Sequence, residues 1–390
     1  MDEFENSNQA PELSFTRENM AEFGQYRILE KIAGGGMAEI YRVEDPQNPS
    51  EVFALKLIRP DLAHEPDFRE MLLDEARIAG RLDHRNIARV LKLIENDGEL
   101  GLLLEHVDGV DLIRVQQTLR ERKRELSLEA ALLVLLDTLD GLHYAHDLFD
   151  DEGEQLNIVH RDVSPGNIMV ETSGHIRIVD WGIAGGKKRK AQTETGQVKG
   201  KFRYMAPEQI MGEPAVRGTD IYSASATFWE LLAGERIYGE IELTQLMMKV
   251  SKGEMPGLEK ARTGLPRALI SVFRKATSLV PDRRYSSAAK YAAALRALRL
   301  IHNEEKARAE LSRVATNARV KDGKRGYARA VEKVRFISAE YESLESALLR
   351  ALETPDRVEV LDLSKREIIM AEATARSDFI ARGPGQSSTW

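Results

Sequence analysis

Three short polar motifs, in a fixed order, constrain the fold of this chain more than any other feature. A single match of three residues is weak evidence, because short strings recur by chance, but several matches in one order are specific. Their order along the chain therefore carries more information than any one of them. The motifs are His160-Arg161-Asp162-Val163-Ser164-Pro165-Gly166-Asn167, Asp180-Trp181-Gly182 and Ala206-Pro207-Glu208.

The part of the chain before these motifs has the pattern of a small antiparallel sheet with one helix. Apolar residues at helical spacing predict an amphipathic helix over 68–82, with Glu75 on its apolar side. An acid in that position needs a partner of opposite charge. Runs of β-type residues, separated by Pro, Gly and Asn, occur at 26–29, 40–43, 52–58, 90–94 and 100–105.

Beyond Gly109 the pattern becomes mainly helical. The stretch 127–146 is apolar on more than one face, which predicts a buried core helix. A second apolar helix is predicted over 220–233, with Gly234 as its stop. His143 and His146 lie one helical turn apart, but no third ligand accompanies them, so we interpret them as core or helix-end histidines rather than a metal site.

The motifs and their order resemble those of the protein kinase superfamily, over about residues 24–300. Gly35 to Glu39 and Tyr204 to Gln209 are similar to the bacterial, eukaryotic-type (Hanks-type) serine/threonine protein kinases. The resemblance implies an α+β, two-lobed protein kinase fold. A small antiparallel β lobe with one main helix would precede a larger, mainly helical lobe.

The composition along the chain predicts four segments. Residues 1–22 are acidic and poor in apolar side chains, so we expect a disordered leader. The kinase domain is predicted over 23–303, with the N-lobe at about 23–108 and the C-lobe at about 109–303. A helical C-terminal extension follows over 304–378, and then a disordered tail over 379–390.

The extension carries an apolar stripe that must be buried on some partner surface. Apolar residues recur at three- and four-residue steps from Tyr327 to Leu348. Ser364 to Glu367 fits a capping box, which predicts a last helix through about Arg376. The extension could be an intramolecular cap, a dimer seam or a docking arm for a partner, and we favour packing on the kinase lobes.

Composition excludes several classes of function. A net charge of −7 gives no global basic field, so we expect no nucleic-acid partner. The chain contains no cysteine, which excludes disulfides, thiolate metal sites and a cysteine nucleophile. No apolar run is long enough for a membrane span, and the start lacks an apolar signal-peptide stretch, so we expect a cytoplasmic protein without a membrane partner.

The resemblance assigns the central roles to five residues. Lys56 would hold the α- and β-phosphates of ATP, and Glu75 would fix Lys56 by an ion pair. Asp162 would accept and orient the substrate hydroxyl, while Asn167 and Asp180 would hold Mg²⁺. Glu208 and Arg284 resemble the family's buried structural ion pair.

The resemblance also places the nucleotide. The phosphate-covering loop departs from the family pattern, because Ala33 and Ala38 stand where two of its glycines are usual, and this substitution would stiffen the loop. Backbone groups of Glu105 and Val107, in the hinge segment 104–107, would bind adenine, and Asp111 would meet ribose hydroxyls. The predicted nucleotide-binding residues are Ile32, Ala33, Gly34, Gly35, Gly36, Met37, Ala38, Glu39, Ile40, Ala54, Lys56, Leu104, Glu105, Val107 and Asp111.

A second departure concerns the charge beside the catalytic acid. Serine/threonine kinases usually carry lysine two residues after this acid and threonine before the Y-M-A-P-E motif, but here those places hold Ser164 and Lys201. We predict an exchange that keeps the local charge, with the Lys201 ammonium within reach of Asp162 and Ser164 nearby. Both are therefore candidate catalytic residues.

The resemblance predicts an ATP- and Mg²⁺-dependent kinase for serine or threonine in protein substrates. Thr193 and Thr195 are candidate autophosphorylation sites, and Arg161 would read the new phosphate. A pseudokinase that binds partners without transferring phosphate is the alternative, favoured by the altered loop glycines and by Ser164.

Overall fold

The computed structural model describes residues 22–34, 38–63, 66–181, 200–319, 358–362 and 367–371. The chain divides into two compact units, one of residues 31–323 and one of residues 1–30 with 324–390. The larger unit contains all the predicted site residues.

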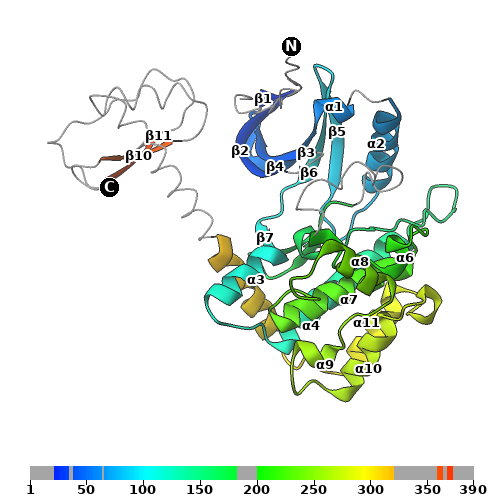
Figure 1. Ribbon diagram of the computed structural model, residues 1–390. Coiled ribbons are helices and arrows are strands. Elements are labelled where there is room, and N and C mark those ends of the chain that lie inside the picture. Colours follow the sequence, from blue (N-terminus) through cyan, green and yellow to red (C-terminus); the bar gives the residue numbers. More distant parts are fainter. Residues whose placement is uncertain are drawn as a thin grey trace, which may run out of the picture. The chain divides into compact units, whose positions relative to one another are not determined.

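A twisted antiparallel sheet with one main helix forms the first lobe (Figure 1). Leu72, Ala76 and Ala79 of the main helix are buried in one cluster with strand residues such as Leu100 and Leu102, so the helix covers one face of the sheet. The order of strands is β1-β2-β3-β4-β6-β5. The elements are β1 (Glu22–Phe23), β2 (Tyr26–Gly34), β3 (Ala38–Asp45), β4 (Asn48–Ile58), α1 (Pro60–Ala63), the main helix α2 (Pro66–Ala79), β5 (Val90–Asn96) and β6 (Glu99–Glu105).

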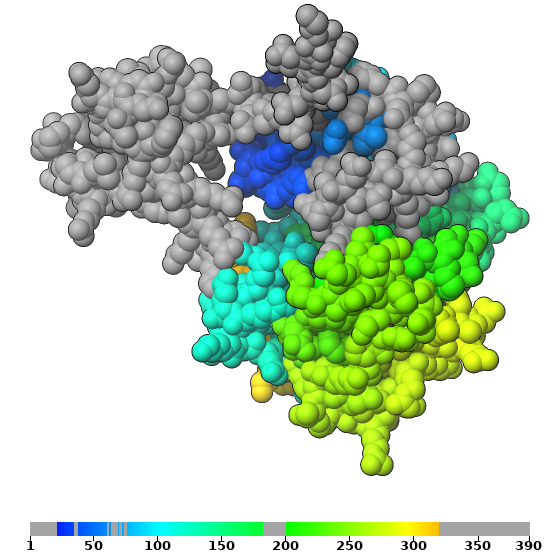
Figure 2. Space-filling view, in the orientation of Figure 1, coloured from blue at the N-terminus to red at the C-terminus, as the bar shows by residue number. Residues whose placement is uncertain are grey.

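Helices dominate the second lobe, whose side chains form one continuous cyan, green and yellow surface in Figure 2. The central α4 packs against α7 and α11, and almost every side chain of its middle turns is buried. The helical elements are α3 (Leu112–Glu121), α4 (Leu128–His146), η1 (Pro165–Asn167), α6 (Pro207–Ile210), α7 (Arg217–Ala233), α8 (Leu243–Ser251), α9 (Leu258–Ala261), α10 (Arg267–Ala276), η3 (Pro281–Arg283) and α11 (Ala288–Ala297).

Two predicted core helices are confirmed, because apolar residues on several faces leave no solvent-facing alternative. Ser127 caps α4 by accepting a hydrogen bond from the Ala130 N–H. Helix α7 ends at Gly234, whose φ of 67° lies in the left-handed region that only glycine adopts without strain.

A three-stranded sheet, ordered β7-β8-β9, lies in the second lobe and carries the motif residues at its ends. Its strands are β7 (Gly109–Asp111), β8 (Ile168–Glu171) and β9 (Ile176–Ile178). Asn167 comes directly before β8, and Asp180 follows two residues after β9. The β8–β9 hairpin therefore brings these two side chains to its open end.

Residues 304–319 form a helix that belongs to the core of the second lobe. Ala307, Leu311, Ala315 and Ala318 recur at helical spacing and are buried in the same apolar cluster as α4. The start of the predicted extension thus packs on the second lobe, whereas the packing that we favoured for its apolar stripe stays a prediction. The apolar stripe from Tyr327 to Leu348, the leader up to residue 21 and the tail lie outside the described residues.

The second unit contains the antiparallel pair β10 (Val358–Asp362) and β11 (Glu367–Ala371). The helix predicted from Ser364 is therefore wrong over Glu367–Ala371. The backbone of this segment pairs in register with Val358–Asp362, and the β-branched residues Ile368 and Ile369 favour a strand over the helix that the capping signal predicts.

The predicted structural ion pair is confirmed. The Arg284 guanidinium donates to both carboxylate oxygens of Glu208, at 2.7 and 2.8 Å, and both side chains are buried. The pair ties the residues after Ala206 to the loop that holds η3. Among the described residues, no helix has the length and apolar character needed to cross a bilayer.

Candidate active site

A buried carboxylate holds the loop that contains Asp162. Asp220, in the first turn of α7, accepts hydrogen bonds from the backbone N–H groups of His160 and Arg161, both at 2.8 Å. The His146 ring nitrogen Nε2 lies 2.8 Å from the same carboxylate. This is why His146 is a core histidine rather than a metal ligand, as predicted.

Burial raises the pKa of Asp220, but the hydrogen bond and charge of His146 and the charge of His160 outweigh burial and hold the pKa below its ordinary value. The carboxylate is therefore ionised and fixes two backbone N–H groups at once. Asp220 was not among the site residues predicted from the sequence. An acid at the start of an otherwise apolar helix was the available signal, since it must find donors when the helix is buried.

Asp162 is surrounded by groups that orient and neutralise its carboxylate. The Asn167 amide nitrogen Nδ2 donates to the Asp162 carbonyl at 2.8 Å and to its carboxylate Oδ2 at 3.0 Å. The Lys201 ammonium lies 2.5 Å from the same Oδ2. The predicted contact between Lys201 and Asp162 is thus confirmed, and its catalytic role stays a prediction.

Ser164 lies two residues from Asp162 and is buried. Its backbone carbonyl accepts from the Asn167 N–H at 2.9 Å, which closes the turn that leads into η1. In the sequence, Ser164 stands at the position where the resemblance expects lysine.

Lys56 and Asp180 form an ion pair that joins the two lobes. Strand β4 presents Lys56 directly across from Ile40 on β3 and Leu102 on β6. The charge of Lys56 is the largest influence on Asp180, and with Lys201 and His160 it holds the pKa of this carboxyl below its ordinary value against the opposing effect of burial. Asp180 is therefore ionised at neutral pH.

The predicted adenine site lies where β6 leaves the sheet. Ala54 is buried and pairs directly across from Leu104. The Glu105 N–H donates to the Arg89 carbonyl at 2.9 Å, and the Val107 carbonyl accepts from Gly109. Among the described residues no hydrogen bond involves the Val107 N–H, which leaves it available to a ligand.

Other predicted nucleotide residues lie at the end of β2 and at the start of β3. Ile32, Ala33 and Gly34 are exposed at the end of β2, whereas Ala38 is buried at the start of β3. Glu39 pairs with Lys31 and accepts from the Tyr41 hydroxyl at 2.7 Å, so it ties β3 to β2. The positions Gly35, Gly36 and Met37 lie outside the described residues.

Asp111, the predicted ribose contact, already has a structural role. The Asp111 carboxylate caps α3 by accepting from the Arg114 N–H at 2.7 Å, so any ribose contact would share this carboxylate with the helix. The Glu75 side chain lies outside the described side chains, and its ion pair with Lys56 stays a prediction. Trp181 is buried, with its ring 4.7 Å from that of His160.

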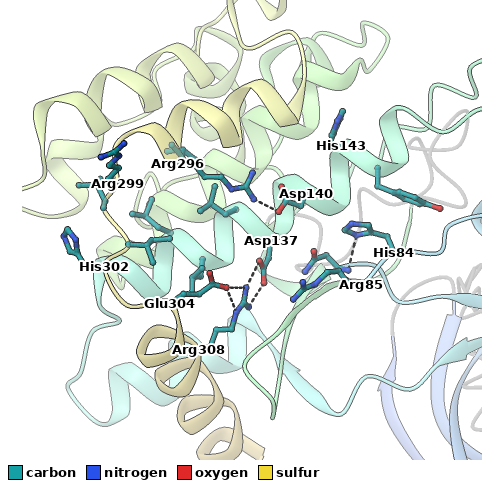
Figure 3. A pocket seen from close by; sticks show the side chains of 18 of the residues that line it. His84, Arg85, Asp137, Asp140, His143, Arg296, Arg299, His302, Glu304 and Arg308 are labelled. Carbon is teal, nitrogen blue, oxygen red and sulfur yellow. Dashed lines mark hydrogen bonds and ion pairs between the residues drawn. The ribbon is translucent and has the colours of Figure 1, made fainter.

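A cavity of about 980 Å³ lies between α4, the end of α11 and the residues that follow it (Figure 3). None of the predicted site residues lines it. Its carboxylates are already paired, Asp137 with Arg308 and Asp140 with Arg296. The cavity is therefore separate from the residues predicted to carry the chemistry.

The known proteins that this chain resembles are protein kinases. The family model described as protein kinase domain matches residues 26–296. The chain is 34% identical over 275 residues to the tyrosine-protein kinase MasK of Myxococcus xanthus, covering 70% of this chain and 43% of that protein. It is 32% identical over 268 residues to the serine/threonine-protein kinase PrkC of Bacillus subtilis, covering 68% and 39% of the two.

Among solved structures, the crystal structure of the Mycobacterium tuberculosis PknI kinase domain matches with a TM-score of 0.53 and 26% identity, covering 71% of this chain and 97% of that one. The chain thus spans less than half the length of MasK and PrkC, but almost all of the PknI kinase domain. The predicted two-lobed fold is confirmed. Its motifs, its fold and its bacterial relatives together show that the chain belongs to the protein kinase family.

Proposed function

We propose that this chain is an ATP- and Mg²⁺-dependent serine/threonine protein kinase that transfers the γ-phosphoryl group of ATP to a protein hydroxyl. The observation that carries the proposal is the meeting of Lys56, Asp180, Asp162, Asn167 and Lys201 in one site, from residues far apart in the sequence. Phosphoryl transfer needs this kind of site, because the protein must position two reactants and balance spreading negative charge.

Each charged group has a distinct task in this proposal. The Asp162 carboxylate accepts the hydrogen bond of the substrate hydroxyl and takes its proton as the phosphoryl group is transferred. Lys201, beside that carboxylate, balances charge on the transferred group from the acceptor side. Lys56 contacts the phosphates from the sheet side and keeps Asp180 ionised.

Asp180 and Asn167 fit the requirements of a magnesium site. Carboxylate and amide oxygens are hard ligands of the kind that Mg²⁺ prefers. The Asn167 amide nitrogen is engaged by Asp162, so its oxygen is the atom left for a ligand. When bound, Mg²⁺ neutralises charge on the phosphates, and the two residues would hold it at the open end of the β8–β9 hairpin.

A tyrosine hydroxyl is the second candidate acceptor. MasK is named a tyrosine-protein kinase, and Ser164 replaces the lysine that serine/threonine kinases usually carry. Pro165 and Asn167, which fit the serine/threonine type of catalytic loop, favour the first candidate. Phosphoamino-acid analysis of the labelled products separates the two.

The test compares the unchanged protein with Asp162→Asn during incubation with labelled ATP, Mg²⁺ and a generic protein substrate. We expect the substitution to lower kcat by roughly 10³-fold, since it removes the base and part of the charge balance. Asp151→Asn, which changes an exposed acid of the same lobe, is the matched control and should keep full activity.

Mass spectrometry of the same samples tests autophosphorylation at Thr193 or Thr195. Equal transfer by the unchanged protein and by Asp162→Asn would refute the proposed mechanism. Nucleotide binding without transfer by the unchanged protein would support the pseudokinase alternative instead.

A further inference from the structure

The turn between β8 and β9 lies against the helix 304–319. The Ser312 hydroxyl donates to the Thr172 carbonyl at 2.6 Å. At Gly174 the two backbones come so close that an added Cβ would lie 2.3 Å from the Arg308 carbonyl oxygen. The helix therefore contacts this turn through both a side chain and its backbone.

The same turn contacts Asp108, the residue directly after the hinge segment. The Thr172 N–H donates to the Asp108 carbonyl and the Thr172 hydroxyl to its carboxylate, both at 2.9 Å. Arg319, at the far end of the described helix, forms an ion pair with the Asp108 carboxylate. Asp108 is thus bound on one side by the turn and on the other by the helix.

These contacts lie next to the adenine end of the proposed nucleotide site. Asp108 directly follows Val107, whose N–H is available to adenine. The hairpin whose turn contains Thr172 carries Asn167 and Asp180 at its other end. A change in the helix can therefore reach the adenine end of the site through one residue, Asp108.

The helix itself is firmly held. The Arg308 guanidinium donates to both carboxylate oxygens of Asp137 on α4, at 2.9 and 3.2 Å, as Figure 3 shows. The Glu310 carboxylate accepts from the Ser127 N–H at 3.0 Å and from its hydroxyl at 2.6 Å. With its apolar side in the core, the helix is a fixed support from which Arg319 reaches the hinge.

We propose that Arg319 and Ser312 are positioning residues for nucleotide binding, which act through Asp108 and Thr172 to fix the hinge segment. The inference rests on the proposed function in one respect, that the site binds nucleotide. It assigns to a helix beyond residue 296, where the family match ends, an indirect part in setting nucleotide affinity.

The test measures the affinity of the full chain for a non-hydrolysable ATP analogue with Mg²⁺, by calorimetry, beside the thermal unfolding temperature. We expect Arg319→Ala to weaken binding by about three- to fivefold, as for the loss of one exposed ion pair. Arg313→Ala is the matched control, because Arg313 lies on the same helix and, among the described residues, donates only to the Ala309 carbonyl. It should leave the affinity unchanged.

A charge exchange makes the test independent of simple truncation. Arg319→Asp alone should weaken binding further than Arg319→Ala, because it places two carboxylates together. Combining it with Asp108→Arg restores opposite charges and should recover part of the affinity relative to Arg319→Asp alone, although the bond from the Thr172 hydroxyl to the Asp108 carboxylate is lost. Ser312→Ala should weaken binding in the same direction through the loss of its bond to the turn.

The outcomes separate this inference from the proposed function. A lower unfolding temperature for Arg319→Ala with unchanged affinity would show a purely structural role and overturn the inference. No recovery in the charge-exchanged pair would also overturn it. If the unchanged protein binds the analogue but transfers no phosphate, the proposed function fails while the affinity comparison still decides the inference. If it binds no nucleotide, both fail.

Discussion

Two residues of the candidate site have backbones in the left-handed region. Arg161 has a φ of 67° and Asp180 a φ of 59°. For residues other than glycine this conformation costs about 1–2 kcal/mol each, so other contacts must hold it. At Arg161 the support is the bond from its N–H to Asp220, and at Asp180 the side chain is held by Lys56. The strained positions are therefore Asp180 and the residue directly before Asp162, and these are the two acids of the proposed mechanism.

The exchange of Ser164 and Lys201 predicts that the Lys201 ammonium contributes to turnover. Lys201→Met should lower kcat by about 10²-fold, the usual effect of losing one preorganised charge beside the transferred group. Steady-state kinetics should show little change in the KM for ATP, since Lys201 acts on the acceptor side. Lys252→Met, at an exposed lysine, is the control.

The reciprocal variant sharpens this prediction. Ser164→Lys combined with Lys201→Thr restores the arrangement that most serine/threonine kinases carry, and it should recover much of the lost kcat. Full activity in Lys201→Met would contradict the role of this ammonium.

Among the elements, the sequence predicted those whose signal is local and missed those that depend on distant partners. Helices α4 and α7 follow from apolar periodicity and from caps within a few residues. Strand β11 was missed because its pairing with β10 outweighs a local capping signal. The role of Asp220 was missed for the same reason, since its partners lie some sixty residues earlier in the chain.

The meeting of the site residues could be predicted only through the resemblance. No periodicity places Lys56 beside Asp180, because these residues come from different lobes. The contact of Lys201 with Asp162 followed from a missing charge, which is a chemical argument rather than a pattern. The docking of residues 304–319 was only favoured, because Thr172 and Asp108 carry no signal of their own.

The contact between the helix 304–319 and the β8–β9 turn can be tested by a substitution at Gly174. Gly174→Ala should destabilise the protein, because the added Cβ meets the Arg308 carbonyl and the φ of +88° suits only glycine. Gly153→Ala is a closely matched control, since Gly153 has a φ of +87° and nothing within 4 Å of an added Cβ.

Both variants bear the same backbone cost, so the difference between their free energies of unfolding reports the contact. We expect Gly174→Ala to be lower in stability by about 1–3 kcal/mol, the usual cost of overpacking. Equal values in urea denaturation would show that the helix and the turn separate without cost.

Buried carboxylates contribute to the stability of the larger unit, and they make that stability depend on pH in acid. At Glu208 burial raises the pKa, but the hydrogen bonds and charge of Arg284 outweigh burial and hold the pKa below its ordinary value. The pKa of Asp220 is lowered in the same manner. Each group therefore contributes stability above its unfolded-state pKa of about 4 and loses it as the pH falls through the folded-state pKa.

We accordingly expect the free energy of unfolding to change little above about pH 5 and to fall steeply below about pH 4. Urea denaturation across this range measures the slope. In Glu208→Gln the slope should be shallower, because one of the titrating groups is gone, although the overall stability is lower. An equal slope in both proteins would rule out this carboxylate as a source of acid sensitivity.

The placement of Lys201 has a practical consequence. The Lys201 ammonium belongs to the stretch of chain that leads to Ala206. Arg203 anchors this stretch by donating a hydrogen bond to the Ile237 carbonyl at 2.9 Å. Asp162, by contrast, belongs to the loop held by Asp220. Under the proposed function, charge balance at the transferred group therefore depends on the alignment of two separately anchored stretches of chain. A compound that binds between them and separates Lys201 from Asp162 would then lower activity without occupying the ATP site.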